Sequence, residues 1–404
     1  MALIAKVYSE INNHLDYFRI SNSLNEDVYK RFSELSIFFE FTYPLCLDEN
    51  EKLANALKNF IFLEIETLSD NKVFENIYVS YHIIVPYVSI RRYQKIEKLE
   101  KYVNLIIANK LFPLEAPPHR AMEWDYLLYK LDSNYKVPIP SSSILKQNFQ
   151  LQYFDREMAY GLTHALFYLM DFGFSNHELP LENLHKLKFQ LEALIIKFSE
   201  HEDVDLVLEL GINYFSLLPF IEIDYSILKI IQYTLDKASF VEFDWNSDVL
   251  IKKYHSCFVL GILTALLNYY SNSEKLEKSK LNLLLSALQS TIFINFTDFK
   301  SPEYTHDFIS SLSIVQSWEF LKKTRIKEFN VELYKKYVEQ FDSHKFLTQS
   351  ILGSLQFLKI RNEHEVLWSD EFEELNLDLI DRQRLKSDFQ DKIEKDINYL
   401  QSLL

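Results

Sequence analysis

The chain has 404 residues, of which 48% are hydrophobic and 25% charged, a composition typical of a folded globular protein. It carries 43 Lys and Arg against 58 Asp and Glu, so its net charge of −15 should repel nucleic acids and anionic membranes. Glycine is scarce, with 5 residues, and neither G-x-G-x-x-G nor G-x-x-x-x-G-K-[ST] occurs. These features argue against Rossmann and P-loop folds, and we expect no nucleotide cofactor.

Helical periodicity runs through most of the chain. Residues 184–198 place leucines on one stripe and lysines on the other faces, whereas 163–174 and 258–267 are apolar nearly all round. No Asn-Gly or Asp-Gly hairpin and no sustained two-residue alternation indicates a strand. The sequence therefore predicts an all-α fold. The other segments that we expect to be helical include 2–19, 50–68, 95–109, 279–291, 331–341 and 388–403.

Two segments interrupt this pattern. Residues 133–144 are polar and contain two prolines, which predicts the longest loop. From about residue 361 the chain becomes more charged. We therefore predict a helical body over 1–360 and a charged C-terminal helical appendage over 361–404, which packs on the outside or forms a homo-oligomer contact.

The cysteines and the N-terminus bear on the compartment. Cys46 and Cys257 cannot build a disulfide framework, and residues 1–18 contain no long apolar signal stretch. No run of 18 apolar residues occurs, so no membrane span is expected. The sequence predicts a cytoplasmic protein that contacts neither membrane nor nucleic acid.

Histidines recur at the starts of apolar helical segments. His82, His119, His164, His255 and His306 each lead into such a segment, and Asn213 falls near the middle of the longest interval. The mean spacing fits a pair of antiparallel helices, which takes ~40–47 residues in HEAT-type repeats. Six such pairs can close into an (α/α)6 toroid around a cavity or stack as an open α-solenoid. In the toroid, the histidines would meet at one end of the inner helices.

The strongest local pattern is a polar stripe on an apolar helix. Glu157, Tyr160, His164, Tyr168 and Asp171 are three or four residues apart, so they are expected to share one helical face. Buried polar groups without partners are costly, so such a stripe needs mutual hydrogen bonds or a ligand. Asp171 could instead act as a capping or pairing group before Gly173.

A second candidate pair is His119 and Glu123, whose i,i+4 spacing suits either an acid–base pair or an ordinary helical contact. If His119, His164 and His255 converge, three imidazoles could hold Zn²⁺ with an open fourth position. Glu123, Glu157 and Asp171 would then orient the ligands or act as the general base. Without a metal, the same residues would form a histidine–carboxylate centre for acid–base chemistry.

The run Tyr160-x-x-Thr163-His164-x-x-Phe167-Tyr168-x-x-Asp171-Phe172-Gly173, with His119 before it and Tyr254-His255 after it, resembles an uncharacterised bacterial family of all-helical, toroid-like proteins. Some members of that family accompany natural-product gene sets. The resemblance covers about the middle half of the chain and implies no particular reaction. The chain lacks the Asp-x-Asp-Asp motif of terpene cyclases and the Cys/Cys/His ligand set of lanthionine cyclases.

Two functional hypotheses follow. In the first, the protein is an enzyme with a His/carboxylate centre, zinc-bound or metal-free, that modifies a small molecule or peptide in natural-product metabolism. Its catalytic candidates are His164, Glu123, Asp171, Glu157 and Tyr160, and its metal candidates are His119, His164 and His255. In the second, the protein is a non-catalytic helical-repeat module that binds a peptide or protein in a groove.

Overall fold

A computed structural model describes residues 2–20, 25–67, 77–108, 117–146, 154–174, 184–225, 227–237, 247–273 and 276–290, with a few positions between 391 and 401. All regular structure in these ranges is helical, and the all-α prediction is confirmed. The predicted boundary at 361 and the predicted helix over 331–341 lie outside the described residues. So does His306.

The described residues include three single-turn 3-10 helices, η1 (Leu15–Phe18), η2 (Ile144–Lys146) and η4 (Asp171–Gly173). The α-helices are α1 (Ala2–Asn13), α2 (Glu26–Glu49), α3 (Glu51–Glu66), α5 (Ile77–Arg91), α6 (Glu97–Ala108), α7 (Pro118–Leu131), α8 (Arg156–Met170), α9 (Leu184–Glu200), α10 (Val204–Phe215), α11 (Ile227–Lys237), α12 (Ser247–Ser271) and α13 (Lys278–Ser290).

The chain divides into two compact units. The first contains Met1–Gln147, Arg156–Glu182 and Phe198–Ser301, and the second contains Asn148–Asp155, Asn183–Lys197 and Pro302–Leu404. Within the second unit, the Lys197 ammonium group donates a hydrogen bond to the Phe154 carbonyl. The pocket described below belongs to the first unit.

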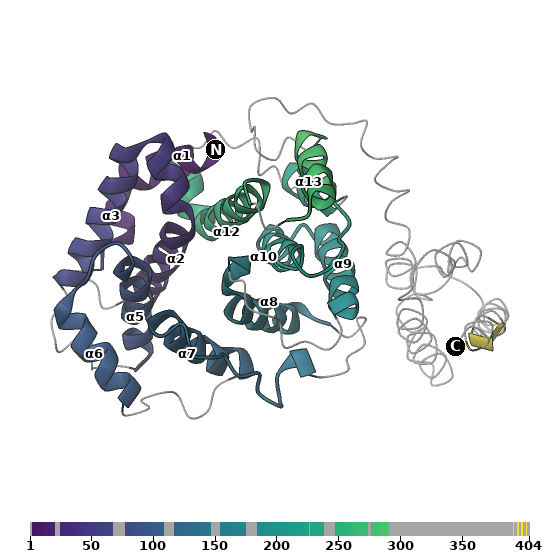
Figure 1. The fold of residues 1–404 in the computed structure, drawn as a ribbon, viewed down its shortest axis with the longest axis horizontal. Helices are drawn as coiled ribbons and strands as arrows, with labels where there is room; N and C mark the ends of the chain where they lie inside the picture. The colour runs from purple at the N-terminus through teal and green to yellow at the C-terminus, as the bar shows by residue number, and fades with distance from the viewer. Residues whose placement is uncertain are drawn as a thin grey trace, which may run out of the picture. The chain divides into compact units, whose positions relative to one another are not determined.

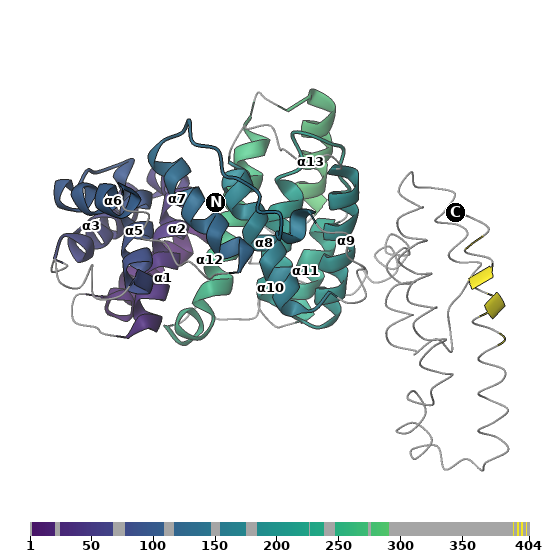
Figure 2. The same cartoon turned by 90° about the horizontal axis from the view of Figure 1, so that it is seen from below.

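Six helices of the first unit each pack on the next, and the last of them packs on the first (Figure 1). Helix α2 packs on α5, α5 on α7, α7 on α8, α8 on α10, α10 on α12, and α12 on α2. Other helices flank these: α1 contacts α2, α3 and α12, α11 contacts α10, and α13 contacts α12 (Figure 2).

Helix boundaries follow local chemistry. The Asn25 side chain accepts a hydrogen bond from the Asp27 backbone N–H and caps α2, and Asp203 caps α10 in the same way at Leu206. Pro118 occupies the first turn of α7, where its missing N–H has no helical partner to lose. Helix α7 ends at Leu131, and turns with irregular backbone follow up to η2, where the sequence predicts a loop.

Packed aromatic side chains form much of the core. The rings of Phe38 and Phe258 stack at 5.0 Å between α2 and α12, and both side chains are buried. At Gly261 a Cβ atom would lie 2.4 Å from the Phe38 ring, so glycine permits this close approach. Within the described part of the chain, no helix is long and apolar enough to cross a bilayer.

Candidate functional site

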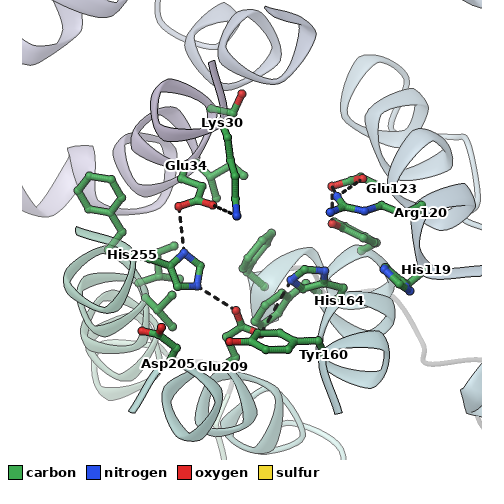
Figure 3. Close-up of a pocket in the computed structure, with 18 of the residues that line it drawn as sticks. Lys30, Glu34, His119, Arg120, Glu123, Tyr160, His164, Asp205, Glu209 and His255 are labelled. Carbon is green, nitrogen blue, oxygen red and sulfur yellow. Dashed lines mark hydrogen bonds and ion pairs between the residues drawn. The ribbon is translucent and has the colours of Figure 1, made fainter. Parts of the chain in front are cut away.

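A pocket of about 840 Å³ lies among these six helices (Figure 3). Side chains from α2, α5, α7, α8, α10 and α12 line it, together with Phe172 of η4. A cavity of this size is typical of sites for small molecules.

Polar and apolar lining residues are separated along α2, α7, α8 and α10. On α2 the lining residues run from Glu26 near its start to Ile37, and on α10 they run from Asp205 to Ile212. These positions are spaced three or four residues apart, so they share the face turned to the pocket. Because the lining residues of these four helices are polar near the start and apolar further on, the polar side chains gather where α2, α7, α8 and α10 begin.

His255 lies between two carboxylates. Its Nδ1 atom is 3.0 Å from Glu34 Oε2, and its Nε2 atom is 3.2 Å from Glu209 Oε1. Figure 3 shows this bridge, which links α2, α12 and α10 across one side of the pocket. Both ring nitrogens donate in an imidazolium, so this arrangement suits the charged ring.

The pKa values of the bridged groups follow from these contacts. Burial alone would lower the pKa of His255, but Glu34 and Glu209 outweigh it and raise that pKa well above its ordinary 6.5. Burial would likewise raise the pKa of Glu34, but the neighbouring imidazole lowers it. At neutral pH His255 is therefore an imidazolium, and Glu34 beside it is a carboxylate.

His164 has the opposite character. Burial lowers its pKa well below 6.5, and the nearby charges of Arg120, His119 and His255 lower it further. Its Nδ1 atom is buried and has no hydrogen-bond partner among the described residues. Its Nε2 atom lies 3.9 Å from Glu209 Oε2, beyond hydrogen-bonding distance. The ring is therefore neutral at pH 7 and is not committed to a strong hydrogen bond.

Glu209 connects the two histidines. Its carboxylate faces His255 and His164, and it accepts a 2.7 Å hydrogen bond from the Thr163 hydroxyl. The side chain is 1% exposed, so the imidazolium and the hydroxyl together satisfy an otherwise costly buried charge. Asn213, one turn further on, donates to the Thr163 carbonyl and is not among the lining residues.

The other side of the pocket holds a second hydrogen-bonded group. Arg120 contacts both oxygens of Glu123, at 3.1 and 2.9 Å, and the Tyr168 hydroxyl donates to Glu123 at 2.6 Å. Burial and the Glu123 carboxylate raise the pKa of Tyr168 well above 10, so this phenol stays protonated. The rings of His119 and His164 lie 5.7 Å apart between the two groups.

Tyr160 lies one helical turn before His164. The Arg156 guanidinium donates to its hydroxyl at 2.9 Å and lies 4.7 Å from the ring centroid. Burial, and then the carboxylates of Glu209, Asp203 and Asp205, raise the Tyr160 pKa. The protonated hydroxyl can therefore donate a hydrogen bond at neutral pH.

Of the predicted site residues, His119, Glu123, Glu157, Tyr160, His164 and His255 all line this pocket, as does His82. Asp171 does not. Helix α8 ends at Met170, and Asp171 accepts hydrogen bonds from Tyr126 at 2.6 Å and Lys130 at 3.0 Å. Asp171 was predicted to share the polar face of this helix, but the helix ends one residue before it. The backbone leaves the helical conformation there, because Asp171 and Phe172 have left-handed φ values of 50° and 54°.

The zinc prediction requires ligands that converge on one point. Among the described residues, no three His, Cys, Asp or Glu side chains form a group that could hold a metal ion. The two nitrogens of His255 face carboxylates in this geometry. A metal at the three predicted histidines would therefore need His255 to turn away from Glu34 or Glu209.

Sequence reasoning missed Glu34 and Glu209, which hold the bridge. Glu209 did leave a signal, because it is a single carboxylate inside the apolar segment VDLVLELGINYF. Such a residue needs a buried partner. Glu34 left a weaker signal, since α2 contains several other charged residues.

The fold and this pocket define an all-helical protein with a histidine- and carboxylate-lined cavity. The chain belongs to the family described as a domain of unknown function (DUF6895), whose model matches residues 6–217. The matched segment includes Glu34, His119, His164 and Glu209, and it ends before His255. No curated protein and no solved structure matches the chain.

Proposed function

We propose that α2, α5, α7, α8, α10 and α12 are the inner helices of an (α/α)6-type toroid. Two observations support this arrangement over an open solenoid. The last of these helices, α12, packs on the first, α2, and all six contribute side chains to one pocket. In an open stack, the first and last repeats would not touch. The ring begins with α2, one helix earlier than the histidine spacing suggests.

We further propose that the protein is an enzyme in which His164 acts as a general base. The observation that carries this proposal is a neutral imidazole beside a fixed, buried carboxylate in a cavity. A base must be unprotonated at working pH and able to reach the proton that it accepts. When His164 takes up a proton at Nε2, the Glu209 carboxylate 3.9 Å away stabilises the resulting imidazolium.

The surrounding groups have supporting roles. His255 and Thr163 orient the Glu209 carboxylate through hydrogen bonds, and Glu34 contacts the other ring nitrogen of His255. The Tyr160 hydroxyl can donate a hydrogen bond to charge that develops on the substrate. Two histidines beside one carboxylate therefore have pKa values shifted in opposite directions, which is a common feature of acid–base sites.

The test is a comparison of metabolite conversion. Purified protein is incubated with bacterial metabolite extracts, and mass spectrometry identifies compounds that are consumed and formed. We expect His164→Gln to abolish conversion. The control His14→Gln changes a histidine directly after α1, outside the pocket, and should retain conversion. Equal conversion by wild type and His164→Gln would contradict the proposal. Binding of a compound without conversion would instead favour the non-catalytic module.

A zinc-bound centre stays a prediction that elemental analysis can test. The metal would be held by His119, His164 and His255, and it would activate water or polarise an oxygen. One equivalent of zinc in the purified protein, lost in His255→Gln, would support that version. It would replace the His164 base assignment, because a metal-bound imidazole cannot accept a proton.

A further inference from the structure

We propose that the pocket takes an organic cation, a molecule with an ammonium or guanidinium group on an aromatic or apolar body. This inference rests on the proposed function, because it places the substrate in the same pocket. It adds the chemical class of that substrate.

Carboxylates outnumber basic side chains around the pocket. Three Lys and Arg side chains line it: Lys30, Arg120 and Arg156. Seven carboxylates line it: Glu26, Asp27, Glu34, Glu123, Glu157, Asp205 and Glu209. The imidazolium of His255 offsets one of these charges, and neutral His164 adds none. An anionic ligand would therefore enter against an excess of negative charge.

The three basic side chains are already paired. Lys30 lies 3.8 Å from Glu34, Arg120 lies 2.9 Å from Glu123, and Arg156 lies 2.6 Å from Asp203. A ligand carboxylate or phosphate would have to compete with these protein carboxylates for each cation. The existing pairs thus reduce the attraction that the pocket offers to an anion.

Four of the seven lining carboxylates, Glu26, Asp27, Glu157 and Asp205, form no ion pair within the part of the chain that the structure describes. Asp205 accepts a hydrogen bond from the Ser256 hydroxyl, and Glu157 lies exposed in the first turn of α8. Asp205 is labelled in Figure 3, below His255 and beside Glu209. Arg156 acts on Asp205 electrostatically without forming an ion pair with it, so a ligand cation could contact this carboxylate directly.

The helix dipoles offset only part of the negative charge around the pocket. Helices α2, α7, α8 and α10 begin at the pocket, and each N-terminus corresponds to about half a positive charge. First-turn carboxylates also stabilise their own helices, which gives Glu26, Asp27, Glu157 and Asp205 a structural role as well. Together the four helix starts offset about two charges, so the pocket remains negative.

The apolar lining favours a cation over a plain hydrocarbon. Aromatic side chains attract cations through the negative faces of their rings, and the Arg156 guanidinium already lies over the ring of Tyr160. Further rings line the pocket at Trp124, Phe167, Phe172, Tyr254 and Phe258. An ammonium group can therefore contact both carboxylates and ring faces, while its apolar body contacts the isoleucines and phenylalanines beyond.

The test uses three probes of similar shape and different charge. Isothermal titration calorimetry of the full chain measures the affinity of 2-phenylethylammonium, 2-phenylethanol and 3-phenylpropionate at pH 7 and low salt. We expect the ammonium to bind about tenfold or more tightly than the carboxylate, with the alcohol between them. The variant Asp205→Asn/Glu157→Gln should reduce this preference several-fold. The control Glu66→Gln, which removes an exposed charge from α3 outside the pocket, should not.

Two results would overturn the proposal. One is equal or tighter binding of the carboxylate, and the other is no detectable binding of the ammonium at millimolar concentration. Because the measurement needs no turnover, it separates the two proposals. If the His164→Gln variant loses conversion but keeps the preference for the ammonium probe, the result supports both the enzyme and the cation site. Charge preference without any conversion, in wild type as well, supports the cation site and contradicts the enzyme.

Discussion

Two clusters of the first unit each place one basic side chain between two largely buried carboxylates. In the pocket, His255 lies between Glu34 and Glu209. In the second cluster, Lys130 lies 2.5 Å from Glu40 and 3.0 Å from Asp171, and none of these three lines the pocket. The charge pattern is the same, but only the first cluster lines the pocket described above, where a neutral histidine lies near its cation. The comparison indicates that the surroundings of an ion-pair cluster, and not the ion pairs themselves, distinguish a candidate chemical site from a structural one.

The Lys130 cluster joins α2, α7 and the turn after α8. Lys130 is charged, because its two carboxylates outweigh the effect of burial on its pKa. Asp171, Phe172 and Gly173 all have positive φ, and a Cβ atom at Gly173 would lie 2.3 Å from the Ser216 hydroxyl. The cluster thus holds one end of a strained turn from which Phe172 enters the pocket lining. We infer that the cluster helps to position this wall of the pocket.

The largest expected effect comes from removing the central cation of this cluster. Lys130→Met should lower the free energy of unfolding by roughly 3–5 kcal/mol, because it leaves the largely buried carboxylates of Glu40 and Asp171 without their cation. Urea unfolding followed by circular dichroism measures this loss. Lys146→Met, which changes an exposed lysine of η2, should stay within about 0.5 kcal/mol of wild type. A loss below 1 kcal/mol for Lys130→Met would show that the cluster is not structural.

Removal of the cation in the pocket should cost less. His255→Gln should lower the free energy of unfolding by roughly 1–3 kcal/mol, because the pocket admits water to Glu34 and glutamine can still donate one hydrogen bond. The same unfolding measurement tests it. If His255→Gln costs as much as Lys130→Met, the two clusters are equivalent in stability and the contrast between them fails.

The fold was largely predictable because helical periodicity is a local property. The apolar segments around Leu166 and Leu263 lie in α8 and α12, as their patterns indicate. The histidine positions also gave useful information, since His82, His119, His164 and His255 line one pocket. The ring that we propose was only partly foreseen, because α2 begins it without a histidine and contributes Glu34 instead.

The site was less predictable because it depends on contacts between distant segments. His255 meets Glu34 across 221 positions of sequence, and no local spacing reports such a contact. Asp171 shows the opposite error. Its spacing from His164 fits a helical face, but a strained turn begins there and Lys130 holds its carboxylate elsewhere. Tertiary contacts decided both cases.

The third prediction concerns pH, where the two kinds of histidine should act in opposite directions. His255 has a folded-state pKa above 6.5, so its stabilising effect is complete below pH 6.5 and is lost as pH rises through the folded value. His164, His119 and His82 have folded-state pKa values below 6.5, so stability is lost as pH falls below 6.5. The contribution of these four residues to stability should therefore peak near pH 6.5.

Thermal unfolding from pH 5 to 9 tests this, with His255→Gln as the informative variant. Wild type should lose stability on both sides of the maximum. The variant should keep the acidic loss and show a much smaller alkaline loss, because it lacks the group that releases its proton there. An unchanged alkaline slope in His255→Gln would mean that other groups set it and that the bridge does not hold an imidazolium.

The smallest effect on stability should come from the residue with the largest proposed effect on chemistry. His164 makes no hydrogen bond through Nδ1, and its Nε2 atom lies beyond bonding distance of Glu209. Replacing it by methionine removes a buried polar group without stranding a partner, since Glu209 keeps His255 and Thr163. His164→Met should therefore leave the free energy of unfolding within about 1 kcal/mol of wild type, or raise it. Urea unfolding measures this change directly. A loss above 2 kcal/mol would show that His164 stabilises the fold, as Lys130 does.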